Sequence, residues 1–232
     1  MDSQVLRVRL LRSAAVGLAL SFVSLSASAQ GPTRVVAWND LGMHCLDPDF
    51  SVFSLLPPYN TFHAQLMVNG VLQHQPGAYT LSYSAIADPS GSINRTSLGK
   101  TNFWQHVQDL FGVALAPDMG LAGYGMPGAS NVPQPMGFDA PWSWFSATGI
   151  PITPLDDAQR VNPYPLMAVT ARNAAGQIVA STMLTVPNSE EMTCTECHTS
   201  FTNPFARPTA GWVQDPDPLL DDRLNILRLH DE

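Results

Sequence analysis

Residues 166–186 read LMAVTARNAAGQIVASTMLTV, and this stretch decides the class of the fold. Apolar and polar residues alternate through 166–172 and again through 178–186, and the second run is rich in β-branched side chains. Alternation with a period of two indicates a half-buried strand, and the residues Asn, Ala, Ala and Gly between the runs are typical of a tight turn. The stretch therefore predicts a β-hairpin.

Similar patterns occur before this hairpin. Asn69-Gly70, a strong hairpin turn signal, separates apolar runs at 63–68 and 71–75. Residues 79–87 alternate between apolar and polar, and residues 34–38 form a short apolar run. About six strands with turn signals between them predict a mainly β fold, an antiparallel β-sandwich-like domain.

Two helices are expected beside the strands. The first begins near Thr101, a candidate N-cap, and ends at Gly112. The second begins at Asp217-Pro218, a good pair for the N-cap and the first helical position, and continues to about His230, with leucines at 220, 224 and 227 repeating at i, i+4 and i+7. The expected apolar face of the first helix consists of Phe103, Val107, Leu110 and Phe111.

A long region at 117–141 contains five Gly, five Pro and three Met. Loops of this length are uncommon in a compact domain unless they are functional or mobile. The region either covers a cofactor face or is an ordinary surface excursion, and the second interpretation is preferred. Trp142, Trp144 and Phe145 follow it directly and are expected to anchor it to the core.

The N-terminus has the pattern of a secretory signal. Three arginines lie among the first twelve residues, an apolar stretch follows at 14–25, and Ala27-Ser28-Ala29 supplies a small-residue cleavage site. We expect residues 1–29 to be removed and the mature protein to be periplasmic or extracellular; an uncleaved anchor is the alternative. No second long apolar run follows, so no membrane span is expected after cleavage.

The mature part keeps 8 basic and 18 acidic residues, which gives a net charge near −10 with neutral histidines. Nucleic-acid binding is therefore not expected, because little positive charge is present to neutralise phosphates. A negative surface suits encounters with basic partner proteins. The sequence gives no indication of the oligomeric state.

Cys194-Thr195-Glu196-Cys197-His198 fits the attachment pattern for c-type haem. Two thiols three positions apart suit the two vinyl groups on one edge of a porphyrin, and the histidine that follows is then placed under the iron. The motif predicts one covalent haem c on Cys194 and Cys197, with His198 as the proximal iron ligand. An odd total of three cysteines also disfavours a disulfide framework.

Two other readings of the motif remain open. A structural zinc site would combine Cys194, Cys197 and His198 with Cys45 or His44, although such sites usually show a second paired motif. A thioredoxin-like redox pair is less favoured, because no βαβ pattern surrounds the motif.

The second axial ligand is not fixed by the motif. Only 34 residues follow His198 and none is Met, so the arrangement of the small cytochromes c, with a methionine ligand well downstream, is not expected. His44, beside Met43 and Cys45 in a break between strands, and His230, at the end of the predicted terminal helix, are the candidate distal ligands. A methionine from the 117–141 loop is a further alternative.

Four segments resemble a bacterial family of exported multihaem c-type cytochromes: Trp38-Asn39-Asp40-Leu41-Gly42-Met43-His44-Cys45, Leu56-Pro57-Pro58-Tyr59-Asn60, the Cys194–His198 motif, and Asn225-Ile226-Leu227-Arg228-Leu229-His230-Asp231. The likeness spans nearly all of the mature chain. Members of that family usually continue past the His-Asp pair with more haem motifs, so this chain is expected to correspond to a short or truncated member. The resemblance implies electron transfer through bound haem.

Together these observations predict a signal peptide at 1–29, a β-rich domain at 30–188 and a haem-binding segment with a terminal helix at 189–232. The leading hypothesis is electron transfer with redox partner proteins, so an electron carrier is favoured over a catalyst. The alternatives are a haem enzyme of the peroxidase or reductase type with an open sixth position, a zinc-binding β-sandwich module, and a sensor whose sandwich recognises a ligand.

Overall fold

The computed structural model describes residues 31–40, 42–190 and 192–232. The predicted signal peptide, like Leu41 of the first family-like segment, lies outside the described residues. The chain is mainly β, with 31% strand and 16% helix. All pairings within its two larger sheets are antiparallel, which confirms the predicted fold class.

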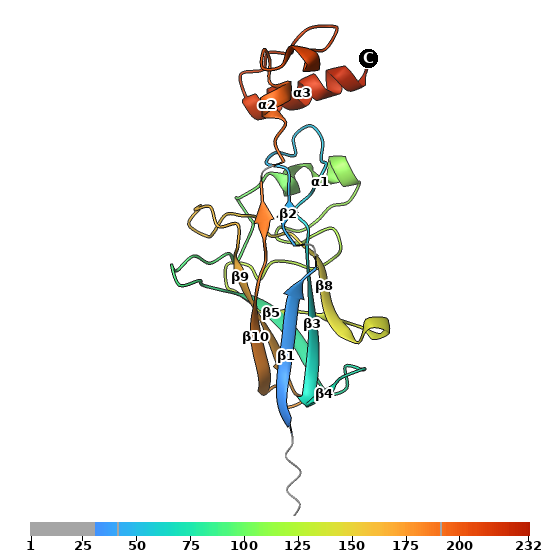
Figure 1. Ribbon diagram of the computed structural model, residues 1–232, viewed down its shortest axis with the longest axis vertical. Helices are drawn as coiled ribbons and strands as arrows, with labels where there is room; N and C mark the ends of the chain where they lie inside the picture. Colours follow the sequence, from blue (N-terminus) through green and yellow to red (C-terminus); the bar gives the residue numbers. More distant parts are fainter. Residues whose placement is uncertain (1–30, 41, 191) are drawn as a thin grey trace, which may run out of the picture. The chain divides into compact units, whose positions relative to one another are not determined.

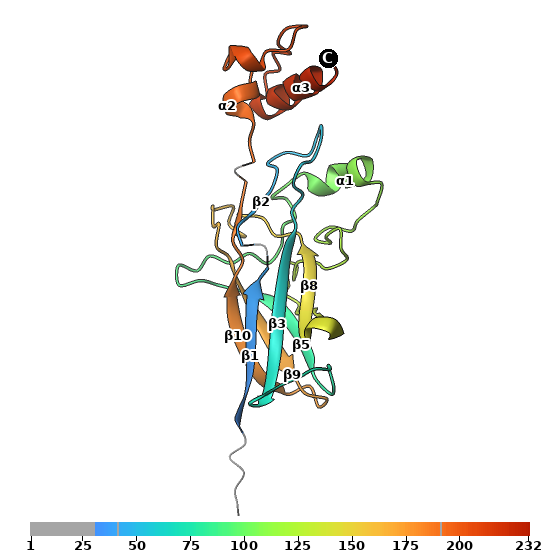
Figure 2. The ribbon, with the colours of Figure 1, turned by 45° about the vertical axis from the view of Figure 1, so that its right-hand side comes forward.

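The first sheet has five strands. Its main order is β1 (Gly31–Asn39), β3 (Asn60–Asn69), β8 (Trp144–Ile150) and β7 (Gly137–Asp139), and β4 (Val71–Leu72) pairs with β3. The second sheet has four strands in the order β10 (Ile178–Thr185), β9 (Leu166–Arg172), β5 (Thr80–Ile86) and β6 (Gln134–Pro135). Figure 1 shows β1, β3 and β8 side by side, and the turned view of Figure 2 shows β5 and β9 behind them.

One hydrophobic core fills the space between the two sheets. Phe62 pairs with Ala147 in the first sheet, Tyr83 pairs with Val169 in the second, and all four side chains are fully buried. The rings of Phe62 and Tyr83 meet edge to face across the core, with centroids 5.4 Å apart. Alternating residues of each strand therefore face the opposite sheet, as in a β-sandwich.

Both predicted hairpins are present. β9 and β10 pair with each other, and the turn between them is closed by a hydrogen bond from the Gly176 N–H to the Asn173 carbonyl. β3 and β4 pair around Asn69-Gly70, where both residues have positive φ, as a type I′ turn requires. The returning strand β4 is shorter than the predicted run at 71–75.

The first helix, α1 (Phe103–Phe111), differs from its prediction in two respects: its N-cap is another residue, and one residue of the expected apolar face is exposed. Its N-cap is Asn102, while the Thr101 hydroxyl accepts a hydrogen bond from the Phe103 N–H, and Gly112 ends the helix in the left-handed region as predicted. Phe103 and Val107 are buried, but Phe111 is 39% exposed. Phe111 lies in the last turn, where the helix leaves its small core around Phe103.

The 117–141 region packs on the sandwich. Met126 and Met136 join the core between the sheets, and the Tyr83 hydroxyl donates to the Gly125 carbonyl at 2.6 Å. A short helix, η1 (Ala140–Trp142), follows β7. Of the three expected anchors Phe145 is buried and Trp144 is half-buried, but Trp142 is 62% exposed because it stacks on the outer side of Trp144.

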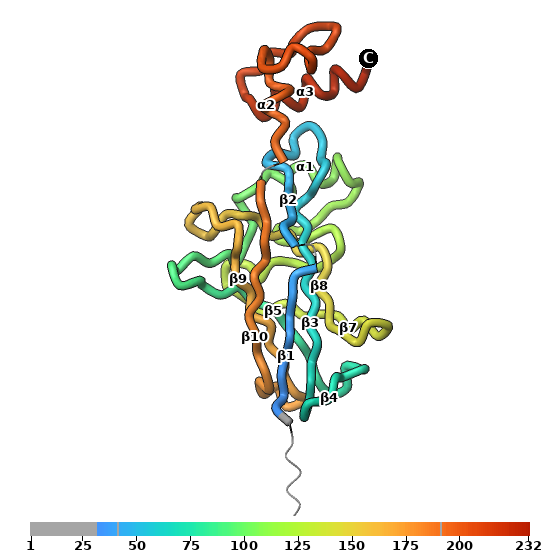
Figure 3. The backbone as a smooth tube through the Cα atoms, in the orientation of Figure 1, coloured from blue at the N-terminus to red at the C-terminus, as the bar shows by residue number. Residues whose placement is uncertain are grey.

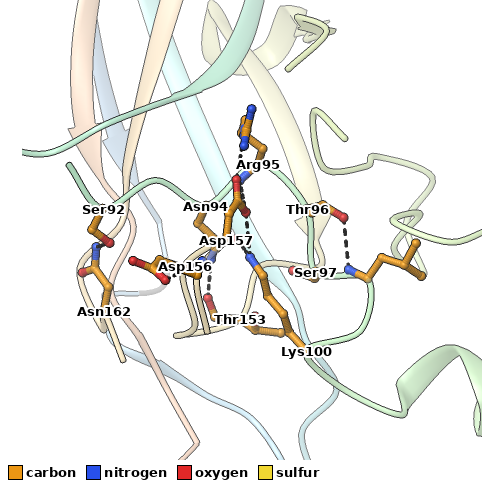
Figure 4. A network of polar contacts seen from close by, with 12 residues as sticks. Ser92, Asn94, Arg95, Thr96, Ser97, Lys100, Thr153, Asp156, Asp157 and Asn162 are labelled. Atoms are coloured by element: carbon orange, nitrogen blue, oxygen red, sulfur yellow. Dashed lines mark hydrogen bonds and ion pairs between the residues drawn. The ribbon is translucent and has the colours of Figure 1, made fainter. Parts of the chain in front are cut away.

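A polar network joins the segment after β5 to the segment after β8 (Figure 4). The Lys100 ammonium, almost fully buried, contacts Asp157 at 2.9 Å and Asn94 at 2.8 Å. Burial lowers the pKa of Lys100, while Asp157 opposes that shift. Asp156 accepts hydrogen bonds from the backbone and side chain of Arg160. These contacts stabilise two long connections that have little regular structure.

Candidate haem attachment site

The chain enters the motif from a short parallel pair of strands. β11 (Asn188–Ser189) pairs with β2 (His44–Cys45), and the backbone N–H of Leu46 donates to the Ser189 carbonyl at 2.8 Å. Figure 3 shows the tube passing from β10 beside β2 before it reaches the C-terminal helices. The segment that precedes the motif is thus attached to residues 44–46.

The motif forms a single helical turn, α2 (Thr195–His198), with Cys194 at its N-cap. The Cys194 carbonyl accepts hydrogen bonds from the backbone N–H of His198 at 2.9 Å and of Cys197 at 3.2 Å. Positions i, i+3 and i+4 of a helix share one face, so the two thiols and the imidazole project from the same side of the turn. All three cysteines of the chain are free thiols, with Cys197 exposed and Cys194 half-buried.

An open cavity of about 520 Å³ lies against this turn and is lined by residues 193–198. Its volume falls within the range of small-molecule and cofactor sites, roughly 300–1,000 Å³. Polar and apolar atoms both contribute to its wall. The motif residues therefore present their reactive side chains to a space of cofactor size.

The geometry does not favour zinc. Among the residues that the structure describes, no group of three or more His, Cys, Asp or Glu side chains converges in a way that could hold a metal ion. A structural zinc site needs four ligands at about 2.0–2.3 Å from one point. Cys194, Cys197 and His198 share a face without such convergence, and neither His44 nor Cys45 completes the set.

The electrostatics do not favour a redox-active dithiol either. Burial raises the pKa of the Cys194 thiol, and the Asp222 carboxylate raises it further, while Arg223 opposes the rise. Reactive cysteines of thiol–disulfide enzymes have lowered pKa values, because the thiolate is the nucleophile. The shift at Cys194 is therefore opposite in direction to that expected of a redox-active nucleophile.

The terminal helix, α3 (Pro218–His230), packs against α2, and the two lie side by side in Figures 1 and 2. The helix begins as predicted, with the Asp217 carboxylate accepting from the Leu219 N–H. Its buried side chains, however, are polar: Asp221, Asp222, Arg223 and Asn225. The predicted leucine repeat does not form the buried face, since Leu227 is 37% exposed.

Two residues of α3 hold the backbone around the motif. The Asn225 side-chain amide donates to the His198 carbonyl at 2.9 Å. The Asp221 carboxylate accepts from the Ser200 N–H at 2.6 Å and from the Ser200 hydroxyl at 2.9 Å. The position of His198 is therefore fixed by its own turn on one side and by α3 on the other.

Arg223 joins α3 to the loop after β2. Its guanidinium lies 3.4 Å from the Asp47 carboxylate and 3.7 Å from that of Asp49, and it donates to the Phe53 carbonyl at 3.2 Å. It also lies over the Phe53 ring, 4.7 Å from the centroid. The side chains of Arg223 and Asp47 are 5% and 1% exposed, so this ion pair is buried.

The segment around the motif buries very little apolar surface. Among the described residues, every buried hydrophobic side chain of the core lies at or before Val186. Phe201 is 72% exposed and Phe205, in the short helix η2 (Pro204–Ala206), is 97% exposed. Neither ring lines the cavity, but exposed aromatic side chains in the same segment fit an apolar cofactor, which would supply the missing core.

Four buried polar atoms of the described site have no hydrogen-bond partner: Nδ1 of His198, Oγ1 of Thr199, Oδ1 of Asp222 and Nε of Arg223. Burial raises the pKa of Asp222, whereas Arg223 and the backbone N–H of Cys194 lower it. The charge of a protonated His198 lowers it as well, so the imidazole lies within electrostatic range of this carboxyl. A histidine that binds iron through one ring nitrogen usually donates from the N–H of the other ring nitrogen to an acceptor. Oδ1 of Asp222 is a buried acceptor of this kind.

The candidate distal ligands do not line the cavity. His44, on β2, has its Nε2 2.9 Å from the Pro57 carbonyl and its ring beside Tyr59. The His230 side chain is 81% exposed and lies 3.4 Å from Asp231. Both keep the place in the sequence that made them candidates, but the structure does not bring either one to the motif.

The loop methionines and two further histidines have contacts away from the motif. Met126 and Met136 of the 117–141 loop are buried in the sandwich core. His63, on β3, stacks on Trp144 with ring centroids 4.4 Å apart and contacts Ser146. His74 contacts Ser143. None of these side chains lines the cavity beside the motif.

Sequence reasoning missed the polar face of α3. Asp222 and Asn225 are three positions apart, a spacing that places both on one side of a helix. The run Asp221-Asp222-Arg223 stands beside a leucine repeat, and charged residues are seldom fully buried unless they are paired. Their placement depends on contacts with residues 47–53 and 194–200, which are not visible as a local pattern.

Comparisons with protein-family models, with curated proteins and with solved structures each found no match. Within the described residues, no helix has the length and apolar character needed to cross a membrane.

Proposed function

We propose that this protein is an exported c-type cytochrome that transfers electrons through one covalently attached haem. Cys194 and Cys197 hold the haem by thioether bonds, and His198 is the proximal ligand of its iron. We further propose that the chain is related to the exported multihaem c-type cytochromes, on the strength of the four sequence segments that resemble them.

One observation carries the proposal: the Cys194–His198 motif, together with Thr193, lines an open cavity of cofactor size. The absence of convergence among these side chains disfavours a bare metal ion. The raised pKa of the Cys194 thiol, caused by burial and by the Asp222 carboxylate, disfavours disulfide exchange. The scarcity of buried apolar side chains after Val186 favours a large apolar group over a small polar ligand.

Each residue has a definite part in this function. Each thiol adds across one vinyl group, with its sulfur bonding to one carbon and its proton passing to the other, so the attachment needs no oxidant. His198 supplies a nitrogen ligand whose backbone is fixed by Cys194 and Asn225. The bound haem supplies a one-electron couple. The acidic surface, near −10 for the mature chain, favours basic redox partners through a small transient contact.

A haem enzyme with an open sixth position is the second candidate. The observation that favours it is that neither His44 nor His230 lines the cavity. An optical spectrum of the reduced protein separates the two functions. Sharp, split bands indicate six-coordinate low-spin iron and an electron carrier, whereas a high-spin spectrum with rapid binding of CO or peroxide indicates the enzyme.

Attachment is tested by mass spectrometry of protein exported from a host with cytochrome c maturation. The expected result is a mass gain of one haem, lost in Cys194→Ala/Cys197→Ala. Cys45→Ala is the matched control, since Cys45 is a free thiol on β2 and is expected to leave the haem in place. Colourless wild-type protein at the plain polypeptide mass would contradict the proposal.

A further inference from the structure

One buried polar atom on α2 and one on α3 have no hydrogen-bond partner, although the two helices pack against each other. Nδ1 of His198 is a buried ring nitrogen, and Oδ1 of Asp222 is a buried carboxylate oxygen. A buried polar group without a hydrogen-bond partner is destabilising, and more so when the group is charged. A hydrogen bond between the two would satisfy both at once.

The helix geometry brings Asp222 to the correct side. Asn225, three positions further along α3, already donates to the His198 carbonyl at 2.9 Å. The backbone N–H of Cys194, at the other end of the motif turn, acts on the Asp222 carboxyl. Asp222 therefore lies against the same turn that carries the imidazole, and it is only 2% exposed.

Burial raises the pKa of Asp222 and Arg223 opposes that rise through its charge and its backbone N–H, but the side-chain contacts of Arg223 are with other residues. Arg223 faces Asp47, Asp49 and the Phe53 ring, so its guanidinium is engaged with the loop after β2. Asp221, the other carboxylate on this part of α3, is engaged with Ser200 and the backbone of Asp215. Among Asp47, Asp49, Asp221 and Asp222, it is Asp222 that has a buried oxygen, Oδ1, without a hydrogen-bond partner.

We infer that Asp222 is the positioning residue for the proximal ligand: its carboxylate accepts a hydrogen bond from Nδ1–H of His198 while Nε2 binds the iron. This inference rests on the proposed haem attachment. A carboxylate acceptor fixes the tautomer and the ring orientation of a metal-bound histidine and increases its basicity. Because the ferric state carries one more positive charge than the ferrous state, a nearby carboxylate stabilises it and lowers the reduction potential.

The test compares Asp222→Asn with the haem-loaded wild-type chain by potentiometric titration. Asparagine keeps the shape and an acceptor oxygen but removes the charge, so the midpoint potential is expected to rise. Asp231→Asn is the matched control: it makes the same change at the end of the same helix on a side chain that is 80% exposed. Its potential is expected to stay at the wild-type value, because solvent screens an exposed charge.

A second measurement uses the wild-type protein alone. In ¹⁵N-histidine NMR of the haem-loaded chain, His198 is expected to show a protonated Nδ1 whose proton exchanges slowly with solvent. This readout stands even if Asp222→Asn does not fold. A rapidly exchanging Nδ1 proton, or equal potentials in wild type and Asp222→Asn, overturns the role of Asp222 alone. Wild-type protein without haem overturns the proposed function, and this inference with it.

Discussion

The β-sandwich and the C-terminal segment, residues 189–232, bury opposite kinds of side chain. The sandwich encloses Phe62, Tyr83 and some sixteen other apolar residues between its sheets. The C-terminal segment buries Asp221, Asp222, Arg223 and Asn225 instead, and leaves aromatic rings exposed. The two regions share one chain but not one source of stability.

The difference indicates which region can fold on the polypeptide alone. Burial of large apolar side chains contributes about 1.5–3 kcal/mol each, and the sandwich has many of them. Hydrogen bonds contribute about 1 kcal/mol each and buried ion pairs contribute little net stability. The C-terminal segment therefore depends on its attachments to the sandwich and, in the proposed function, on the cofactor.

The largest expected effect is that of withholding haem. Protein made without cytochrome c maturation is expected to keep the sandwich folded, while backbone amides at 192–232 exchange at rates near those of an unstructured peptide, because the segment lacks an apolar core. Hydrogen-exchange mass spectrometry of the two preparations measures this. Equal protection of 192–232 in both would remove the contrast between the regions.

A core substitution acts on the other region. Phe62→Ala is expected to lower the free energy of unfolding of the sandwich by about 3–5 kcal/mol, since it deletes a fully buried ring and leaves a cavity. Urea denaturation followed by tryptophan fluorescence measures the change. Trp142→Ala, on an exposed ring, is the control and is expected to cost less than about 1 kcal/mol. A small effect of Phe62→Ala would mean that the sandwich core is not the main source of stability.

The junction between the regions depends on Arg223. Arg223→Met is expected to destabilise the docking of α3 by about 3 kcal/mol, because it leaves the buried Asp47 carboxylate without its cation. Proteolysis within 192–232 should accelerate. Adding Asp47→Asn, which keeps an acceptor for the Leu55 and Leu56 N–H groups, should restore part of the loss. If the double variant is cleaved faster than Arg223→Met, the ion pair is not what holds the segment.

The smallest expected effect is a response of the sandwich to acid. Burial raises the pKa of Asp156, but hydrogen bonds from Arg160, Ser92 and Ala158 outweigh it and lower this pKa from 3.8 to about 2. A lowered pKa in the folded state stabilises the fold above the unfolded value. This contribution, on the order of 1–2 kcal/mol, is lost as the pH falls from about 4 to 2.

Thermal unfolding between pH 5 and pH 2 measures the acid response, and Asp156→Asn should flatten the curve over that interval. A curve of unchanged slope in Asp156→Asn would assign the acid sensitivity to other carboxylates. Measuring the response of 192–232 in the same samples shows whether it is confined to the sandwich.

Local signals were enough to predict most of the sandwich. The alternation at 79–87 gave a strand whose buried residues, Leu81, Tyr83 and Ala85, lie on the predicted face, because a period of two leaves one choice of face once a core exists. The hairpin predicted at 166–186 is also present. The Asn69-Gly70 turn was visible for the same local reason. The N-cap at Asp217 was also correct, since capping involves only neighbouring residues.

Long-range placement was not visible in the same way. The leucine repeat predicted the helix α3 but not which of its residues are buried, and the helix buries Asp222 and Asn225 beside the motif. Trp142 was expected inside and lies outside, because a residue's neighbours along the chain do not show which side of Trp144 it will occupy. The attachment motif was evident from spacing; its supporting residues were not.

The parallel pair β2–β11 has a consequence for the order of assembly. It joins residues 44–45 to residues 188–189 through very few hydrogen bonds, although almost the whole sandwich lies between them in the sequence. Closing such a long loop lowers the entropy of the chain, and the few hydrogen bonds of the pair offset little of that loss. We therefore expect the pair to form after the sheets and to open before them. A thiol-modifying or haem-loading enzyme would then reach Cys194 and Cys197 on a chain whose sandwich is already complete.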